Sequence, residues 1–221
     1  MALLLVDLDG TLIDSVEGIS NCVRHALGAL GTPVPDDATL RSWIGPPLRN
    51  SFARIFDDPR QVEQAISLYR ERFDELGWRE HRVYAGVGEA LGALRDAGHR
   101  LAVCTAKIER HAERIVAHLP FAHLFERITG ATPDGRIGEK PQLIALALER
   151  LGAVPEGAWM IGDRHHDVEG ARHHGMRSAG VLWGFGSEQE LRHAGADVLV
   201  GTPAELADLP EDSPLWPMVT S

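Results

Sequence analysis

Residues 3–15 read Leu-Leu-Leu-Val-Asp-Leu-Asp-Gly-Thr-Leu-Ile-Asp-Ser, a short apolar run followed at once by two carboxylates. The apolar run predicts a buried parallel strand, and Asp7 and Asp9, two residues apart, share one face of an extended chain before Gly10 permits a sharp turn. Neighbouring carboxylates repel unless a cation or a shared proton joins them, and oxygen ligands of this kind suit Mg²⁺. The alternative is that both aspartates only cap a turn.

The whole chain has 221 residues, of which 44% are hydrophobic and 24% charged, as in folded globular proteins. Its net charge of -10 and the lack of a basic run predict neither a nucleic acid nor an anionic membrane as partner. The first apolar run is too short for a signal peptide or a membrane span, so we expect a cytoplasmic protein. Cys22 and Cys104 are expected to be buried thiols. The pattern fits a monomer or a homodimer.

Residues 15 to about 79 show helical patterns only. An amphipathic helix ends near residue 31, and further helices are predicted at 37–43, 47–56 and 60–77. A single helix would suffice to connect two parallel strands, so this block indicates a small inserted domain. We therefore expect a helical domain at residues 15–83, called the cap segment below, and an α/β core domain at 1–14 and 84–221.

From residue 84 onward, strand and helix patterns alternate. Strands are predicted at 100–105, 126–129, 158–161, 178–182 and 197–200, and helices at 87–97, 108–118, 140–151, 166–174 and 187–194. This alternation predicts a doubly wound, mostly parallel, Rossmann-like α/β sheet with helices on both faces. Sites in such sheets lie beyond the carboxyl ends of the strands. The last dozen residues, which are rich in proline, predict a tail.

The chain has only two lysines, Lys107 and Lys140. Lys107 follows a predicted strand, and Lys140 stands where a helix is predicted to begin. A compact ammonium in a chain that otherwise uses arginine indicates a role that a planar guanidinium does not fill. Thr105 and Ala106 precede Lys107, where a hydroxyl and backbone N–H groups at a helix start would seat a phosphate, although Thr105 alone also fits a helix cap. Lys140 stands at a helix start, where the helix dipole disfavours a surface cation.

A further strand end delivers Asp163 where it can share a cation with Asp7. Asp167, four residues on, fits a helix N-terminus, where it either caps or steadies the neighbouring groups. His165 and His166 lie between the two aspartates. A transition-metal site there is disfavoured, because hard oxygen ligands dominate and adjacent residues seldom point the same way.

Taken in order, these motifs resemble those of the haloacid-dehalogenase-like hydrolase superfamily, and the resemblance spans nearly the whole chain. The matching segments are DLDGT at 7–11, Thr105, EKP at 139–141 and GDRHHD at 162–167. The cap segment looks like the C1 cap of that family. Residues 14–15, 45–48 and 181–186 are similar to phosphoglycolate phosphatase-like and bacterial 5′-nucleotidase-like members.

The resemblance implies a Mg²⁺-dependent phosphatase acting on small phosphorylated metabolites. Asp7 would be the nucleophile that becomes an aspartyl phosphate, and Asp9 would protonate the leaving alcohol and then activate water. Mg²⁺ would be held by Asp7, the backbone carbonyl of Asp9 and Asp163, with Asp167 behind them.

The resemblance also implies that Thr105, Ala106 and Lys140 bind the phosphoryl oxygens. Arg49, in the cap segment, would meet a substrate carboxylate through its fork, which makes phosphoglycolate the leading substrate; the alternative is an exposed helix arginine. Trp43 and Phe52 would stack on a nucleobase if the substrate is a nucleoside monophosphate, although their spacing also fits cap core.

The same residues also bear on other activities. Asp9 argues against dehalogenation, because a leaving halide needs no proton. Residues 15–85 contain no lysine, which argues against a phosphonoacetaldehyde hydrolase that forms a Schiff base from its cap. A sugar-phosphate mutase stays open, since Arg49 could bind a second phosphate. A phosphate-accepting signalling receiver domain is disfavoured, because receiver domains lack both a cap segment and a counterpart of Asp9. A binding protein without activity is disfavoured as well, because every motif residue is present in this chain.

Overall fold

The core of the computed structural model, which describes residues 1–209, is a six-stranded sheet. The predicted tail at residues 210–221 lies outside the described part. The strands are β1 (Leu3–Val6), β4 (Arg100–Ile108), β5 (Phe125–Ala131), β6 (Trp159–Gly162), β7 (Arg177–Val181) and β8 (Val198–Val200). Their order is β5-β4-β1-β6-β7-β8, and every neighbouring pair is parallel. The predicted doubly wound parallel sheet is confirmed.

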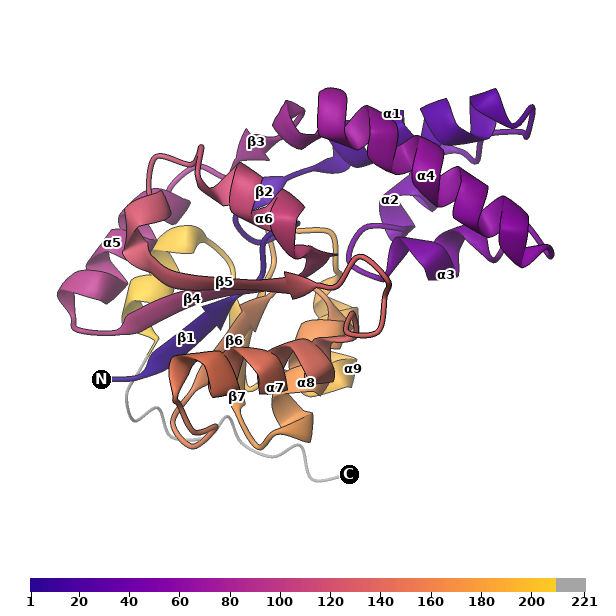
Figure 1. Ribbon diagram of the computed structural model, residues 1–221. Helices are drawn as coiled ribbons and strands as arrows, with labels where there is room; N and C mark the ends of the chain where they lie inside the picture. The colour runs from indigo at the N-terminus through magenta and orange to yellow at the C-terminus, as the bar shows by residue number, and fades with distance from the viewer. Residues whose placement is uncertain (210–221) are drawn as a thin grey trace.

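Helices cover both faces of this sheet (Figure 1). Alternation along β1 turns Leu4 and Val6 toward α5 (Val87–Asp96), while Leu3 and Leu5 face the opposite layer. The first layer is completed by α6 (Glu109–Val116) and the short 3-10 helices η2 (Ala122–Leu124) and η3 (Pro203–Asp208). The second layer contains α7 (Lys140–Leu151), α8 (His165–His173) and α9 (Glu188–Ala194). Burial on both faces explains why β1 is a continuous apolar run rather than an alternating one.

The cap segment is helical, and Figure 1 shows it beside the carboxyl end of the sheet. It contains α1 (Val16–Ala29), α2 (Asp37–Ser42), α3 (Leu48–Phe52), α4 (Pro59–Glu75) and η1 (Gly77–Arg79). Helix α1 packs against α4 along their apolar faces. The predicted helix at 47–56 is shorter than expected, because the regular α-helix ends at Phe52 and only turns follow.

Two short strands join the cap segment to the core. β2 (Ile13–Asp14) and β3 (Arg82–Val83) form an antiparallel pair with Ile13 opposite Val83 and Asp14 opposite Arg82. This pair was not predicted, because two residues carry too little pattern to indicate a strand. It places the outgoing and returning chain side by side.

The carboxyl end of β4 differs from its prediction. The strand continues to Ile108, opposite Ala131 of β5, and α6 begins only at Glu109. The helix predicted at 108–118 is present but shorter, and the strand predicted at 100–105 runs three residues further. The alternative that Thr105 caps this helix is wrong, because Ile108 occupies the N-cap position. Pairing with β5, which is remote in sequence, keeps residues 105–108 extended.

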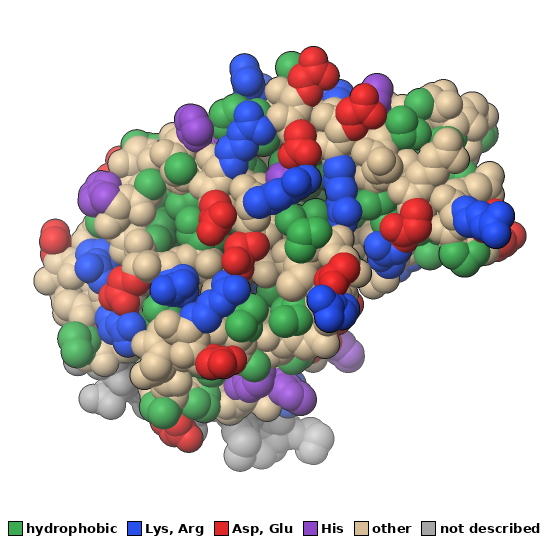
Figure 2. Space-filling view, in the orientation of Figure 1, with side chains coloured by type: hydrophobic (Ala, Val, Ile, Leu, Met, Phe, Trp, Pro, Cys, Tyr) green, Lys and Arg blue, Asp and Glu red, His purple; other side chains and the backbone are tan. Residues whose placement is uncertain are grey.

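Two surface features bear on partners. Figure 2 shows Lys and Arg side chains interspersed with Asp and Glu side chains over the face in view, so that face has no broad positive patch of the kind nucleic acids bind. Among residues 1–209, no helix combines the length and apolar content that crossing a membrane requires.

Candidate active site

Three buried carboxylates gather where β1 and β6 end. Asp7 follows β1, Asp163 follows β6, and Asp167 stands in the first turn of α8. One carboxylate oxygen of each lies within 4.8 Å of the others. The three side chains meet because β1 and β6 are neighbours in the sheet, so the residues after them leave it at the same edge.

Lys140 supplies positive charge to this cluster from the start of α7. Its Nζ lies 3.1 Å from Oδ1 of Asp7 and 2.6 Å from Oδ1 of Asp167, and it donates a hydrogen bond to the carbonyl oxygen of Cys104. Burial lowers the pKa of Lys140, but Asp167 and Asp7 outweigh that effect, so its pKa lies above its usual value. Lys140 is therefore a buried cation.

One ammonium does not balance three carboxylates. Burial raises the pKa of Asp7 to about 6 despite the opposing effect of Lys140, and burial beside Asp167 and Asp7 raises the pKa of Asp163 above its usual range. Burial and the neighbouring carboxylates both disfavour the charged forms, in line with a site that holds more carboxylates than cations. A hard divalent cation bound by carboxylate oxygens would supply positive charge, so the donor set fits Mg²⁺.

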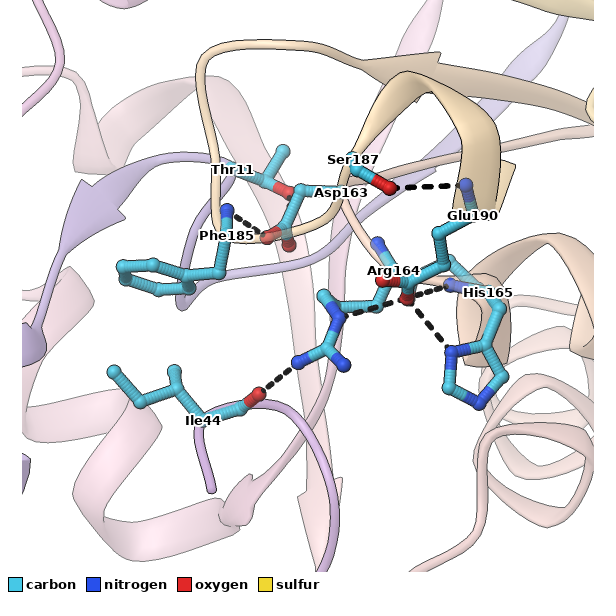
Figure 3. A network of polar contacts seen from close by, with 9 residues as sticks. Thr11, Ile44, Asp163, Arg164, His165, Phe185, Ser187 and Glu190 are labelled. Carbon is cyan, nitrogen blue, oxygen red and sulfur yellow. Dashed lines mark hydrogen bonds and ion pairs between the residues drawn. The ribbon is translucent and has the colours of Figure 1, made fainter. Parts of the chain in front are cut away.

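Asp163 is oriented by the neighbouring loops (Figure 3). The backbone N–H of Phe185 donates to its Oδ2 at 2.7 Å, and the hydroxyl of Thr11 donates to its Oδ1 at 3.4 Å. Gly10, with a φ of 85°, passes so close that a Cβ there would lie 2.2 Å from Oδ2 of Asp163. Only glycine fits this position, which explains the Asp-Gly step after β1.

Asp9 faces Lys107 rather than the three-carboxylate cluster. Oδ2 of Asp9 lies 3.0 Å from Nζ of Lys107, and both side chains are nearly buried. Oδ1 of Asp9 is also buried and accepts no hydrogen bond within residues 1–209. Lys107 was not among the site residues predicted from the sequence, although the rarity of lysine in the chain singled it out. The pairing of Lys107 with Asp9 was not predicted, because it depends on the extended conformation of residues 105–108.

The segment that was predicted to bind a phosphate at a helix start is extended and belongs to β4. Thr105 is buried, and its hydroxyl accepts the backbone N–H of Lys107 at 3.2 Å. Ala106 lies beside it on the wall of a cavity. The hydroxyl therefore shapes the end of β4.

A cavity of about 200 Å³ lies between the core and the cap segment. Core residues in its wall include Asp7, Asp9, Thr105, Ala106 and Lys107. The cap segment contributes mainly apolar and aromatic side chains together with two arginines, namely Trp43, Ile44, Leu48, Arg49, Tyr69, Arg70 and Phe73. The nucleophile and acid–base candidates thus open onto a space roofed by the cap segment.

The structure separates the cap residues singled out in the sequence. Arg49 lines the cavity, and its guanidinium pairs with Glu63. Trp43 also lines it, but Phe52 is fully buried against Trp43, with ring centroids 5.5 Å apart, and is absent from the cavity wall. The expectation that Phe52 could stack on a nucleobase is wrong, because it forms cap core.

Two further aromatic residues of the cavity wall were missed. Tyr69 and Phe73, on α4, stack with ring centroids 5.8 Å apart and contribute to the cavity wall. Their four-residue spacing was visible in the sequence, but it indicates only a shared helix face. Which face of α4 is turned toward the core depends on how the cap segment packs on the core, and the sequence pattern does not give that placement.

Comparison with known proteins gives consistent matches. A family model described as haloacid dehalogenase-like hydrolase matches residues 4–181. A 5′-nucleotidase of Pseudomonas aeruginosa is 45% identical over 191 residues, covering 86% of each chain. Tyrosine-protein kinase PtkA of Mycobacterium tuberculosis is 42% identical over 184 residues, which cover 83% of this chain but only 63% of that relative.

A solved structure extends the match to the fold. The crystal structure of a predicted phosphatase from Clostridium acetobutylicum superimposes with a TM-score of 0.89 at 38% identity, covering 94% of this chain and 96% of that one. The residues matched by the family model include the strand ends that carry the carboxylates. The chain therefore belongs to the haloacid dehalogenase-like hydrolase family.

Proposed function

We propose that this protein is a Mg²⁺-dependent phosphatase that hydrolyses small phosphate monoesters through an aspartyl phosphate on Asp7. The observation that carries the proposal is the buried cluster of Asp7, Asp163 and Asp167, which is paired with Lys140 and in which Asp7 lines the cavity. The division into a core and a cap segment that covers the site, and a cytoplasmic location, belong to the same proposal.

The proposed reaction has two steps. The Asp7 carboxylate attacks phosphorus, the bond from phosphorus to the ester oxygen breaks, and Asp9 donates a proton to the leaving alkoxide. Asp9, now anionic, then removes a proton from water, which attacks the phosphorus of the aspartyl phosphate. The bond between the Asp7 oxygen and phosphorus breaks, and inorganic phosphate and free Asp7 result.

Binding groups surround the transferred phosphoryl group in this proposal. Asp7, Asp163 and the backbone carbonyl of Asp9 would hold Mg²⁺, with Asp167 close enough to contribute. The bound ion would offset charge on the phosphoryl oxygens. The ammonium of Lys140 pairs with the Asp7 carboxylate. In the proposal it also binds the phosphoryl oxygens, together with Thr105 and Ala106.

Phosphoglycolate is the leading substrate. The cavity of about 200 Å³ lies below the roughly 300–1,000 Å³ of typical ligand pockets, which favours a small molecule. Arg49 lines the cavity with a planar fork suited to a carboxylate, provided that it leaves Glu63.

A nucleoside monophosphate is the second candidate. The rings of Trp43, Tyr69 and Phe73 line the cavity and would pack against a base. The similarity to a 5′-nucleotidase supports the same assignment. This substrate needs more room than the cavity offers, so the cap segment would have to move outward.

The test is phosphate release from phosphoglycolate, nucleoside monophosphates, sugar phosphates and pyrophosphate, with Mg²⁺ and again with EDTA. We expect Mg²⁺-dependent release that Asp7→Asn abolishes, while circular dichroism shows an intact fold. Residual turnover by folded Asp7→Asn would refute the mechanism, and no release from any ester would refute the function.

Arg49→Ala separates the two substrates. It should raise KM for phosphoglycolate by about tenfold, as loss of a charged hydrogen bond predicts, and leave KM for a nucleoside monophosphate nearly unchanged. Arg54→Ala is the matched control, because Arg54 is an exposed cap arginine outside the cavity wall. Equal KM changes for both substrates would remove the carboxylate role of Arg49.

A further inference from the structure

Two adjacent histidines at the start of α8 point the same way, contrary to the expectation from the sequence. The ring centroids of His165 and His166 lie 3.7 Å apart, with the rings tilted by 44°. Glu169 follows on the next turn of the helix. One ligand atom from each of these three side chains lies within 4.8 Å of the others. The geometric objection to a metal site at this position is therefore removed.

His165 is fixed by a carboxylate from α9. Its Nδ1 lies 2.7 Å from Oε1 of Glu190, which also accepts the backbone N–H of His165 at 3.0 Å and Nε of Arg164 at 2.8 Å. A ring nitrogen facing a carboxylate carries the hydrogen, so the neutral ring keeps its lone pair on Nε2. Figure 3 shows this second nitrogen turned away from Glu190. A histidine backed by a carboxylate in this way is oriented like a metal ligand.

His166 and Glu169 have no competing partners. Within residues 1–209, neither side chain makes a hydrogen bond or an ion pair, and the ring of His166 packs against the ring of His165. His166 is half-buried and Glu169 is exposed, so both can adjust by rotation. Ligands of a tetrahedral Zn²⁺ lie roughly 3.4 Å apart, given bonds of about 2.0–2.1 Å, so small rotations suffice to close the site.

The local charge also permits a cation. A helix N-terminus disfavours one, but Glu169 and Glu190 bring two negative charges to this end of α8. Within residues 1–209, Arg164 is the only arginine or lysine that forms an ion pair with either of them. Lys140 already pairs with Asp167 and Asp7.

We infer that His165, His166 and Glu169 form a binding site for a divalent transition metal, separate from the Asp7, Asp163 and Asp167 cluster. Two imidazoles with one carboxylate suit Zn²⁺, and equally Co²⁺ or Cu²⁺ as probes, whereas Mg²⁺ prefers oxygen ligands alone. Three protein ligands leave a position for water or for a group of another molecule. This site does not depend on the proposed phosphatase activity.

The test is Zn²⁺ binding by the full chain in excess Mg²⁺, which occupies the oxygen cluster, measured by competition with a chromophoric chelator. We expect one equivalent bound, with affinity lowered about tenfold or more in His166→Gln and in Glu169→Gln. His173→Gln is the matched control, because His173 also stands beside a second histidine, at the other end of α8, but lies outside the ligand cluster. It should bind Zn²⁺ like the unchanged protein.

Spectra of the Co²⁺-loaded or Cu²⁺-loaded protein give a second readout, independent of activity. Signals of imidazole ligation should be present in the unchanged protein and in Asp163→Asn, and weakened in His166→Gln. Three results would overturn the inference: no Zn²⁺ bound in excess Mg²⁺, an equal loss in His173→Gln, or loss of the site in Asp163→Asn. Circular dichroism and thermal melting in EDTA identify any variant that fails to fold, in which case Glu169→Gln decides.

Discussion

The ammonium of Lys107 lies 3.0 Å from Oδ2 of Asp9, and the same ammonium lies 4.7 Å from the ring centroid of Phe73. The first contact is made within the core and the second reaches α4 of the cap segment. Cation–π contacts contribute about 0.5–2 kcal/mol. The proposed acid–base group is thus held by a side chain that also touches the roof of the cavity.

Lys107→Met should lower kcat. The substitution leaves the Asp9 carboxylate at a nearly buried position without its cation, so its orientation is lost. We expect a drop of about tenfold to a hundredfold, up to the roughly 10²–10⁴ that general acid–base catalysis contributes. Steady-state kinetics measure it, with Lys107→Arg retaining the charge as control. An unchanged kcat in Lys107→Met would show that Asp9 needs no partner here.

Asp163→Asn should uncouple stability from Mg²⁺. In EDTA the variant should melt at or above the temperature of the unchanged protein, because one of three crowded buried carboxylates is neutralised while the amide oxygen still accepts the Phe185 N–H. Mg²⁺ should raise Tm of the unchanged protein by several degrees and that of the variant far less. Differential scanning calorimetry measures both; an equal Mg²⁺ response would place the ion elsewhere.

His111 makes stability depend on pH. Burial, helped by Lys107, lowers the pKa of His111 from 6.5 to about 4 although Asp74 accepts from its ring. Between those values the unfolded chain binds a proton that the folded one refuses, so stability falls as the pH drops through this window.

Urea unfolding of His111→Gln tests this effect. Between about pH 7 and about pH 5 the unchanged protein should lose about 2 kcal/mol more than the variant, which keeps a donor for Asp74 but does not titrate. EDTA in both samples removes any contribution of bound metal. Parallel pH curves for the two proteins would contradict the prediction.

Arg164→Ala should weaken substrate binding. A guanidinium nitrogen of Arg164 donates to the carbonyl oxygen of Ile44 at 2.5 Å, which ties the cap loop to α8 (Figure 3). Loss of this bond, at about 1 kcal/mol, predicts a KM about fivefold higher. Arg172→Ala is the control, because Arg172 donates to the backbone carbonyl of Ala194 within the core. It should lower Tm without raising KM; a KM that rises equally in both variants would mean a general loss of stability.

The sheet and the positions of its acidic residues were predictable from the sequence. Alternation predicts parallel strands, and parallel strands deliver their last residues to one edge, so the meeting of Asp7 and Asp163 followed without coordinates. The place of Lys140 at the same site was implied by the family resemblance. Their catalytic roles stay predictions. The unpredicted features depend on contacts remote in sequence: β5 keeps Lys107 extended, and the placement of α4 aims Phe73 at the cavity.

The adjoining strands β2 and β3 have a consequence for how this chain can change. Ile13 pairs with Val83 and Asp14 with Arg82, so the two ends of the segment between these strands lie side by side, about 5 Å apart. Any segment with equally close ends could be spliced there without re-routing a strand of the large sheet. Under the proposed function, the core carries the reaction chemistry and the cap segment the substrate choice. A cap segment transplanted from a relative is therefore expected to give this core a new substrate.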